Sequence, residues 1–551
     1  MMKNRKLLLQ ADGKPWIAIA GEVHNSSSSN ATYMAGIWEK AKELGLNTLL
    51  LPVSWEQIEP REDQFTFGLV DELVQQARAY KMHIIFLWFG TWKNAQSTYA
   101  PEWVKKDLQR FPRAEMEPGK RKIILNNFYN MPYTTLSYLG EETKYADAKT
   151  FAGLMRHLRE IDGKERTVLA VQVENETGVQ GSAREHSALA EQLFATAPPQ
   201  GLVDYLENHT EEMDESLKNV WKNQNAGAER KITPDSKQDG REKSGKEKGW
   251  KETFGLAADE IFSAYHIASY VEYVASAGKA EYDLPMVVNS WLTQGTEPGV
   301  YPSGGPVAKM MEVWNYAAPS IDIYAPDIYV HNFTDICEEY TKLGNPLFIP
   351  ETATHSHCAP RLVYAIGHHH AVCFAPFGIE DMGKPFNSAT AHLFGMDVKD
   401  PLLSIPQDVK EYRYCAATLG SMMDLLSDNY GTDNLQAVIA ENCKAGTGEM
   451  LFGNYRFCVR MAISGQAEQK GVCLILRAEE DAFYMFANAC QIEICSNDKR
   501  WEHCDILSYE EGAFSEGSWV AGRKLNGDEA AAIAFEEYRL VKIKLFLYGD
   551  E

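Results

Sequence analysis

The sequence predicts an α/β fold: a (β/α)8 TIM barrel over residues 1–427, followed by a small C-terminal antiparallel β-sandwich domain over 428–551. Short apolar runs alternate with amphipathic stretches of helical length up to about residue 376, which is typical of repeated βα units. Eight such runs occur, the number that a closed barrel requires. From about Asn429 the pattern changes to the alternation of half-buried strands.

The eight runs are separated by helical patterns. After the first run, Met34, Ile37, Trp38 and Ala41 are spaced to share one helix face, and Gly45 supplies a helix stop. An open, doubly wound sheet is the alternative fold, but no GxGxxG turn follows the first run, which weakens its dinucleotide-binding form. The runs are Trp16–Ala20, Thr48–Val53, Ile84–Phe89, Val168–Val173, Met286–Val288, Ile321–Ala325, Leu347–Ile349 and Ala371–Ala375.

Two further regions complete the predicted organisation. Residues 225–249 mix charged residues, glycine and serine almost without apolar residues, so we expect a solvated loop rather than a binding patch. In the C-terminal region, alternation over Met450–Tyr455, Val472–Leu476, Phe483–Phe486 and Val541–Leu547 predicts the strands of the sandwich.

Composition excludes several classes of function. The 551 residues, 45% of them apolar, are enough for a large core. A net charge of -23 argues against nucleic acid as a partner. No apolar run approaches ~20 residues, and Leu7–Leu9 is too short for a signal-peptide core, so we expect no membrane partner. The ten cysteines stand singly from Cys337 onward, which favours reduced thiols in a cytoplasmic protein. A homo-oligomer is compatible with the sequence.

Polar and aromatic residues follow the apolar runs, where a barrel carries its chemistry. Carboxylates and amides bind sugar hydroxyls and aromatic faces stack on the sugar ring, so this set suits a neutral glycoside. No phosphate cradle and no HExxH helix is present, and we expect no cofactor and no metal. The candidates are Glu22, Asn94, Gln96, Glu174, Asn175, Glu176, Asn289, Trp291, Tyr329 and Glu351.

Two of these residues fit the requirements of glycosidic cleavage. That reaction needs one carboxyl group that stays protonated and another that stays ionised. Glu176 follows the fourth run and Glu351 follows the seventh, so their environments can be tuned separately. A glutamate at a strand end is by default a surface charge or an ion-pair partner. These two lie in apolar contexts, and we expect them to be catalytic.

The segment Gln172–Gly178 reads QVENETG and resembles the QVENEYG signature of family 35 glycoside hydrolases. That family belongs to the clan of (β/α)8 retaining glycosidases whose acid/base ends strand four. The resemblance implies that Glu176 is the acid/base and that Asn175 is a substrate-binding amide. In this clan the nucleophile is a glutamate ending strand seven, which implies that Glu351 is the nucleophile.

Other segments strengthen the resemblance. Gly21–His24 is similar to the family's GExH start, and Leu46–Pro60 is similar to its GLNT…W…EP segment. Asn94–Gln96 resembles the NAE that holds sugar hydroxyls, although Gln96 stands where many members have glutamate. Gly378–Asp381 and the short C-terminal β domain resemble the bacterial subgroup with a DUF5597 module. A run of four serines, Ser26–Ser29, departs from the family's usual aromatic and basic residues.

Glu174 and Tyr329 each have two interpretations. Strand alternation would place Glu174 on the same face as Glu176, where it binds substrate or joins a network, and a structural role is the alternative. Tyr329 lies beside Glu351 if the sixth and seventh strands are neighbours, and its hydroxyl would then keep that carboxylate ionised. The alternative is a rim tyrosine packed under a loop.

Histidines and tryptophans near the strand ends also have alternative interpretations. His355, His357 and the trio His368–His370 suggest a metal, but the trio has no companion carboxylate at ligand spacing, and we expect hydrogen-bonded or exposed histidines. Trp88, Trp92 and Trp291 form either a sugar platform or part of the core.

The sequence therefore predicts a retaining exo-β-glycosidase acting on an oligosaccharide or glycoside by double displacement. Removal of terminal non-reducing β-D-galactosyl residues is the leading activity, and β-glucosaminidase or β-glucosidase activity is the alternative within the clan. A different class, a glycan-binding pseudoenzyme, has no need of both Glu176 and Glu351. We expect the two carboxyl groups to lie about 5–5.5 Å apart.

Overall fold

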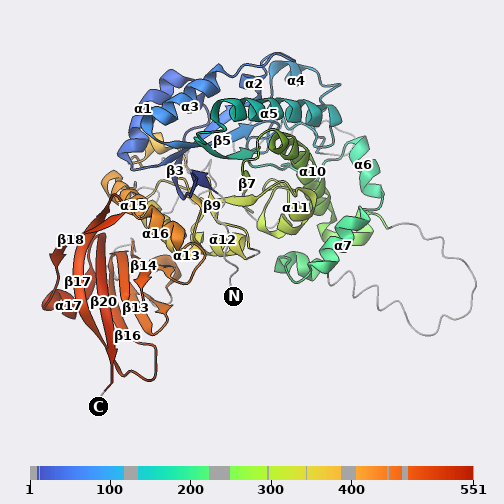
Figure 1. The fold of residues 1–551 in the computed structure, drawn as a ribbon. Helices are drawn as coiled ribbons and strands as arrows, with labels where there is room; N and C mark the ends of the chain where they lie inside the picture. The colour runs from blue at the N-terminus through green and yellow to red at the C-terminus, as the bar shows by residue number, and fades with distance from the viewer. Residues whose placement is uncertain are drawn as a thin grey trace, which may run out of the picture.

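A computed structural model describes residues 9–11, 13–116, 134–221, 248–293, 297–342, 344–385, 405–443, 446–461 and 470–549. A barrel surrounded by helices, coloured blue to yellow in Figure 1, is followed by the sheets of the C-terminal region, coloured orange to red. The loop expected over 225–249 falls outside the described residues, except for its last two residues.

Eight parallel strands form the barrel sheet in the order β8-β7-β6-β5-β4-β3-β10-β9. The two ends of this order meet just beyond the strands, where Ile328 forms a parallel bridge to Thr352 and donates its N–H to the carbonyl of Glu351 at 2.9 Å. This closure confirms the predicted (β/α)8 barrel over the open sheet. The strands are β3 (Ala18–Glu22), β4 (Thr48–Ser54), β5 (His83–Phe89), β6 (Val168–Val173), β7 (Met286–Trp291), β8 (Ile323–Asp327), β9 (Phe348–Ile349) and β10 (Cys373–Phe374).

Several of these strands extend further than the apolar runs indicate. β3 includes Glu22, β7 includes Asn289 and Trp291, and β8 includes Asp327. Backbone pairing continues past the apolar residues, for example between Trp291 of β7 and Asp327 of β8. Several polar candidates are therefore held inside strands rather than on loops, which fixes their direction.

The helices follow the expected amphipathic pattern. α1 (Ala31–Glu43) begins where Asn30 accepts the backbone N–H of Tyr33 at 2.9 Å, and it buries Met34, Ile37 and Trp38 against the barrel. The other barrel helices are α2 (Trp55–Ile58), α3 (Gly68–Tyr80), α4 (Glu102–Lys106), α5 (Glu141–Asp162), α6 (Ala188–Ala195), α7 (Gln200–Asn208), α9 (Trp250–Phe254), α10 (Ala258–Glu281), α11 (Met311–Ala317), α12 (Phe333–Thr341) and α13 (Cys358–His369).

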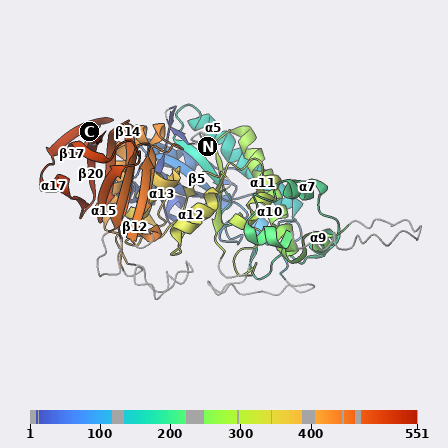
Figure 2. The ribbon, with the colours of Figure 1, turned by 90° about the horizontal axis from the view of Figure 1, so that it is seen from below.

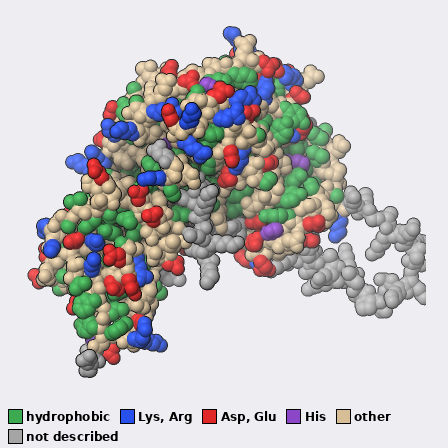
Figure 3. All heavy atoms as spheres, viewed as in Figure 1, with side chains coloured by type: hydrophobic (Ala, Val, Ile, Leu, Met, Phe, Trp, Pro, Cys, Tyr) green, Lys and Arg blue, Asp and Glu red, His purple; other side chains and the backbone are tan. Residues whose placement is uncertain are grey.

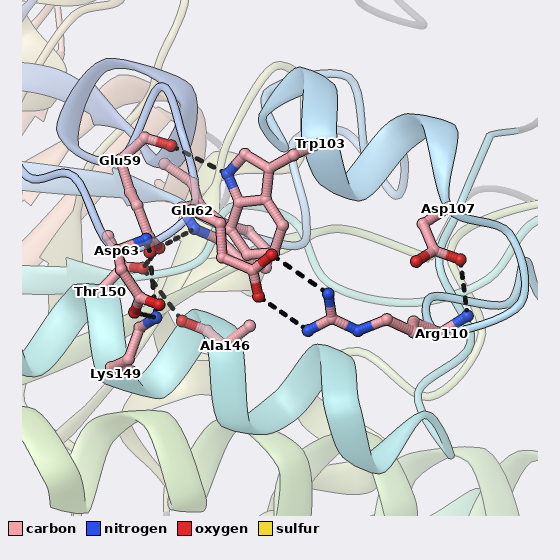
Figure 4. Close-up of polar contacts among 10 residues, drawn as sticks. Glu59, Glu62, Asp63, Trp103, Asp107, Arg110, Ala146, Lys149 and Thr150 are labelled. Atoms are coloured by element: carbon pink, nitrogen blue, oxygen red, sulfur yellow. Dashed lines mark hydrogen bonds and ion pairs between the residues drawn. The ribbon is translucent and has the colours of Figure 1, made fainter.

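Glu59, at the end of α2, is part of the family-like EP segment and is fully buried. Figure 4 shows its polar contacts. Its carboxylate accepts hydrogen bonds from the backbone N–H of Asp63 at 2.7 Å and from the hydroxyl of Thr150, and it pairs with Lys149 at 3.0 Å. Its carbonyl accepts the indole N–H of Trp103 at 3.1 Å. Glu59 therefore ties α2 to α4 and α5, which is a structural role.

The C-terminal region holds two antiparallel sheets. The six-stranded sheet has the order β11-β14-β15-β20-β17-β18 and the four-stranded sheet the order β12-β13-β16-β19. Its elements are β11 (Leu435–Ile439), β12 (Thr447–Phe452), β13 (Tyr455–Met461), β14 (Val472–Glu479), β15 (Ala482–Asn488), β16 (Cys490–Ser496), β17 (His503–Ser515), β18 (Ser518–Lys524), α17 (Asp528–Ala531), β19 (Ile533–Phe535) and β20 (Arg539–Tyr548).

Strands β14 and β15 of the six-stranded sheet are buried on both faces over most of their length, whereas β18 is largely exposed. Cys473 and Ile475 of β14 belong to the core between the two sheets, whereas Leu474 and Leu476 belong to the core shared with the barrel. The helices α13, α15 (Val409–Ser421) and α16 (Met423–Asp428) lie between the barrel and this sheet, as Figures 1 and 2 show. We keep residue 427 as the proposed domain boundary.

A buried polar cluster joins the barrel to the C-terminal region. Glu441, just after β11, accepts from the guanidinium of Arg361 at 3.0 and 3.2 Å and lies 2.8 Å from Nδ1 of His357. His368 and His370 lie 3.0 Å from the carbonyls of Ala437 and Leu435. These histidines are therefore hydrogen-bonded to the C-terminal part, in agreement with the expectation of satisfied side chains.

Surface properties are mixed. Acidic and basic side chains are interspersed over the face shown in Figure 3. Within the described ranges, none of the helices has the length and apolar character needed to cross a membrane. All ten cysteines are described and unpaired, and six of them are buried.

Candidate active site

Four buried carboxyl groups converge at the carboxyl ends of the barrel strands. Glu22 comes from β3, Glu176 from the turn after β6, Asp327 from β8 and Glu351 from the turn after β9. Each is at most 5% exposed. Glu176, Asp327 and Glu351 each place a carboxylate oxygen within 4.8 Å of the other two. Carboxyl groups this close together cannot all be ionised at once, because their negative charges would repel each other without screening by solvent.

Glu351 is surrounded by hydrogen-bond donors. The hydroxyl of Tyr329 donates to Oε2 at 2.7 Å, and Nδ2 of Asn175 donates to Oε1 at 3.4 Å. The Oδ1 of Asn175 in turn accepts from Nζ of Lys93 at 3.0 Å, which orients the amide. Donors of this kind stabilise the ionised form of a carboxylate.

The surroundings of Glu176 instead favour the protonated form of its carboxyl group. Burial, and then the charge of Glu351, raise its pKa to about 8, against a smaller lowering by Lys93. Its backbone N–H donates to Oδ1 of Asn289 at 2.9 Å, which holds the residue in place. A carboxyl group with this pKa is protonated at neutral pH.

The pKa values of the other two carboxyl groups are also raised. Burial is the first cause that raises the pKa of Glu22 and of Asp327 well above the usual values, and the charge of Glu351 is the second. Lys93 lowers both pKa values. The ammonium of Lys93 is buried and lies over the ring of Phe89, 5.1 Å from its centroid.

The backbone of the site is in an unusual conformation. Glu174 and Glu176 have φ values of 63° and 45°, and Asn94 and Ala95 have 52° and 56°. The two turns are bonded to each other, since Ala95 donates its N–H to the carbonyl of Glu176 at 3.0 Å. Left-handed backbone at residues other than glycine is strained and concentrates at functional sites.

The left-handed turn breaks strand alternation at Glu174. The contacts of Glu174 fit the network role that the sequence suggested, and a substrate contact stays a prediction. Its carboxyl group accepts the backbone N–H of Trp92 at 2.6 Å and interacts with the buried carboxyl of Asp147. Asp147 accepts from the indole of Trp88 at 2.9 Å and from the hydroxyl of Tyr270 at 3.1 Å. Glu174 therefore holds the loop after β5 through Trp92 and Asp147, and it is not one of the four carboxyl groups that converge at the strand ends.

Asn289, Gln96 and Asn94 also lie at the carboxyl ends of the barrel strands. Asn289 joins Glu176 to Asp327, donating from Nδ2 to Oδ2 of Asp327 at 2.8 Å. Gln96 is buried and pairs with Lys93 through two backbone hydrogen bonds, of 2.8 and 3.1 Å, and Asn94 is half-buried between them.

The three candidate tryptophans separate into two groups. Trp88 and Trp92 are fully buried and hydrogen-bonded inside the core, so the sugar-platform interpretation is wrong for these two. Trp291 retains 8% exposure.

The serine run has a structural explanation. The hydroxyl of Ser27 and the backbone N–H of His24 donate to Oε1 of Glu380, at 2.7 and 3.1 Å. The hydroxyl of Ser28 donates to the carbonyl of Pro52. Short hydroxyl side chains therefore hold this segment against β4 and against the 3-10 turn Ile379–Asp381 that follows β10.

Lys93 and Asp327 are the two residues of the site that sequence reasoning missed. Lys93 stands inside the WKNAQ string and Asp327 ends an apolar run. A charged residue at the last buried position of a strand is the signal that could have identified Asp327. Nothing in the one-dimensional pattern distinguishes Lys93 from a surface lysine.

The question of a metal ion concerns the same carboxylates. Among the residues that the structure describes, the one cluster of histidine, cysteine or carboxylate ligand atoms close enough to share a cation consists of Glu176, Asp327 and Glu351. These are the same carboxyl groups that converge in the site, so the cluster gives no separate evidence for a metal.

Two family models match the chain. Residues 27–226 match the glycoside hydrolase family 42 model, described as β-galactosidase, and residues 416–535 match DUF5597, a domain of unknown function. No curated protein matches the chain.

The solved structures that resemble this chain include three β-galactosidases. The enzyme of Bacillus circulans sp. alkalophilus is 12% identical with a TM-score of 0.46, over 76% of this chain and 57% of that one. The enzyme of the psychrophilic Marinomonas ef1 is 12% identical with a TM-score of 0.47, over 75% and 61%. A family 42 enzyme of G. stearothermophilus is 10% identical with a TM-score of 0.46, over 98% and 100%. The chain spans about three fifths of the first two structures.

The family assignment made from sequence needs a correction. The QVENE-like string led to family 35, but the supported family is 42, because its model matches residues 27–226. The strand-four Asn-Glu pair is shared across the clan, so this string alone did not separate the two families. The expected DUF5597 module is confirmed by its match to residues 416–535. The chain thus combines a barrel segment, residues 27–226, that matches the family 42 model with a region, residues 416–535, that matches DUF5597.

Proposed function

We propose that this protein is a retaining exo-acting β-glycosidase, with β-galactosidase as its leading activity. The observation that carries the proposal is the approach of Glu176 and Glu351 to within 4.8 Å, oxygen to oxygen. Carboxyl groups about 5–5.5 Å apart belong to retaining enzymes, whereas inverting enzymes keep them about 6.5–9.5 Å apart to admit a water. The short separation supports double displacement.

In the first step Glu351 attacks the anomeric carbon while Glu176 gives its proton to the departing glycosidic oxygen. The C–O bond to the leaving group breaks and a covalent glycosyl-enzyme forms. In the second step Glu176, now ionised, takes a proton from water as the water attacks the same carbon. The ester bond to Glu351 breaks, and the sugar leaves with its original configuration.

The electrostatics support these roles. Glu351 accepts from Tyr329 and Asn175, which favours the charged nucleophile. Burial and the negative charge of Glu351 keep the proton on Glu176. Two carboxyl groups whose environments differ in this way are the pattern of an acid and a nucleophile.

The family 42 description of residues 27–226 supports galactose as the sugar. Buried polar atoms without a protein partner in the described residues include both carboxylate oxygens of Glu22 and Oε2 of Glu176, and these are suited to sugar hydroxyls. No observation favours a glucosaminide, a glucoside or a non-catalytic binder. The cytoplasmic location and assembly into a homo-oligomer stay proposals.

The test is a panel of nitrophenyl β-glycosides assayed with the wild type and with Glu351→Gln. We expect the galactoside to be cleaved fastest by the wild type and no substrate to be cleaved by the variant. NMR of the first-formed sugar should show the β-anomer. Release of the α-anomer would refute the assignment of Glu351 as nucleophile, and equal activity of the variant would refute the proposed function.

A further inference from the structure

Asn289 determines which oxygen of Asp327 can carry a proton. The backbone N–H of Glu176 can only donate, and it lies 2.9 Å from Oδ1 of Asn289. The other end of the amide, Nδ2, therefore faces Oδ2 of Asp327 at 2.8 Å and must donate to it. Because Oδ2 accepts, a proton on Asp327 lies on Oδ1.

Oδ1 of Asp327 is the oxygen left for Glu176. It is buried and has no hydrogen-bond partner of standard geometry among the described residues, and the same holds for Oε2 of Glu176. The carboxyl groups of Asp327 and Glu176 nevertheless interact as a side-chain pair, with oxygens within 4.8 Å. Two buried carboxyl groups this close do not readily ionise together, which favours a proton on at least one of them.

The surroundings of Asp327 favour its neutral form. Glu351, Glu176 and Glu22 act on it as acids, from the turn after β9, the turn after β6 and β3, and the cation of Lys93, from the loop after β5, opposes them. Asn289 on β7 contributes a neutral donor. Burial among three acids and one cation disfavours a further negative charge.

We propose that Asp327 is a positioning residue that remains protonated on Oδ1 through the catalytic cycle and donates a hydrogen bond to the acid/base Glu176. This inference rests on the proposed function. Once Glu176 has given its proton to the leaving group, its carboxylate faces a donor instead of a second anion. When Glu176 later takes the proton of the attacking water, Asp327 keeps its own, so no proton is lost from the pair.

The kinetic test compares Asp327→Leu with Asp327→Asn. Leucine removes the donor, and we expect kcat/KM to fall about 100-fold for a phenyl galactoside, which needs acid help, but less than about tenfold for a dinitrophenyl galactoside, which does not. Asparagine can offer its NH2 to Glu176 and its carbonyl to Asn289, so it should recover most of the loss.

Three outcomes would overturn the inference. If asparagine is as damaging as leucine, the negative charge of Asp327 is what matters, as for an ionised sugar ligand. If leucine lowers kcat/KM equally for both leaving groups, Asp327 has a purely structural role. If Asp327→Leu lowers the rate further in a Glu176→Gln background, Asp327 does not act through Glu176.

Two measurements keep the test valid if the leucine variant fails to fold. The basic limb of the pH profile should stay within about 0.5 unit of the wild type in Asp327→Asn, because one neutral group replaces another. A fall of more than about one unit would mean that an ionised Asp327 had been raising the pKa of Glu176.

Infrared difference spectra of wild type minus Asp327→Asn at neutral pH need no activity, so they distinguish this inference from the proposed function. They should show the loss of a protonated carboxyl band. Loss of a carboxylate band would refute the inference even in an active enzyme.

Discussion

Glu176→Gln removes the proton donor while keeping the shape of the side chain. The structure raises the pKa of Glu176 from 4.5 to about 8. Near pH 6.5 a group with the shifted pKa is roughly 97% protonated, whereas an unshifted one would be about 1% protonated. The pocket therefore supplies about 100 times more acid at that pH, and general acid catalysis as a whole contributes about 10²–10⁴-fold.

The expected loss depends on the leaving group. Cleavage of a phenyl galactoside by Glu176→Gln should fall at least about 100-fold, since expulsion of phenol needs the proton. Release of dinitrophenol should be fast in the first step, so a glycosyl-enzyme accumulates because no general base activates water. Added azide needs no base and should restore turnover, giving the β-galactosyl azide. The basic limb near pH 8 should disappear.

The assay is the rate of phenol release with and without azide, together with the configuration of the azide product. Glu174→Gln is the matched control, because Glu174 is also a buried glutamate but supports the loop after β5. It should show no azide rescue. If azide rescues Glu351→Gln to give the inverted azide while Glu176→Gln stays silent, the two roles are reversed.

Three further substitutions test the supporting residues. Tyr329→Phe removes the 2.7 Å hydrogen bond to the nucleophile. Because such a bond contributes about 1.5–3 kcal/mol, kcat/KM should fall about 10–100-fold. An unchanged rate would contradict this role of Tyr329. Lys93→Met removes the cation that lowers the pKa of the acid/base, so the basic limb should move above pH 8, and a downward shift would exclude this effect. Glu441→Gln leaves the buried guanidinium of Arg361 without its carboxylate. Calorimetry should show that the free energy of unfolding falls by about 3 kcal/mol. An unchanged melting temperature would show that this cluster does not stabilise the junction between the barrel and the C-terminal region.

Much of the barrel could be predicted from local pattern. Strands buried on both faces read as continuous apolar runs, and helices packed against them read as amphipathic repeats. Each of the eight runs overlaps its strand. The sequence also determined the types and order of the polar residues at the strand ends, because a barrel orients every strand in the same direction. Glu176 and Glu351 were identified as the candidate pair for that reason.

Burial in the six-stranded sheet could not be predicted from local sequence pattern. We expected alternation over Val472–Leu476, but this stretch of β14 is apolar and buried on both faces, because one face packs on the second sheet and the other on the barrel. Burial on both faces depends on which elements pack together, which is a property of the complete fold. The histidines at the end of α13 are a similar case, since His368 and His370 contact carbonyls of β11 that lie 69 and 65 residues further along the chain.

The sequence by itself determined the fold class and the two candidate catalytic glutamates. Only the tertiary structure decided how charge is distributed among the site residues. The left-handed turn after β6 directs Glu174 toward the loop after β5, Asp327 of β8 meets Glu176 through Asn289, and Lys93 is buried among carboxyl groups. The physical reason is that a protonation state depends on burial and on the charges within a few ångströms, and those neighbours come from strands far apart in the chain.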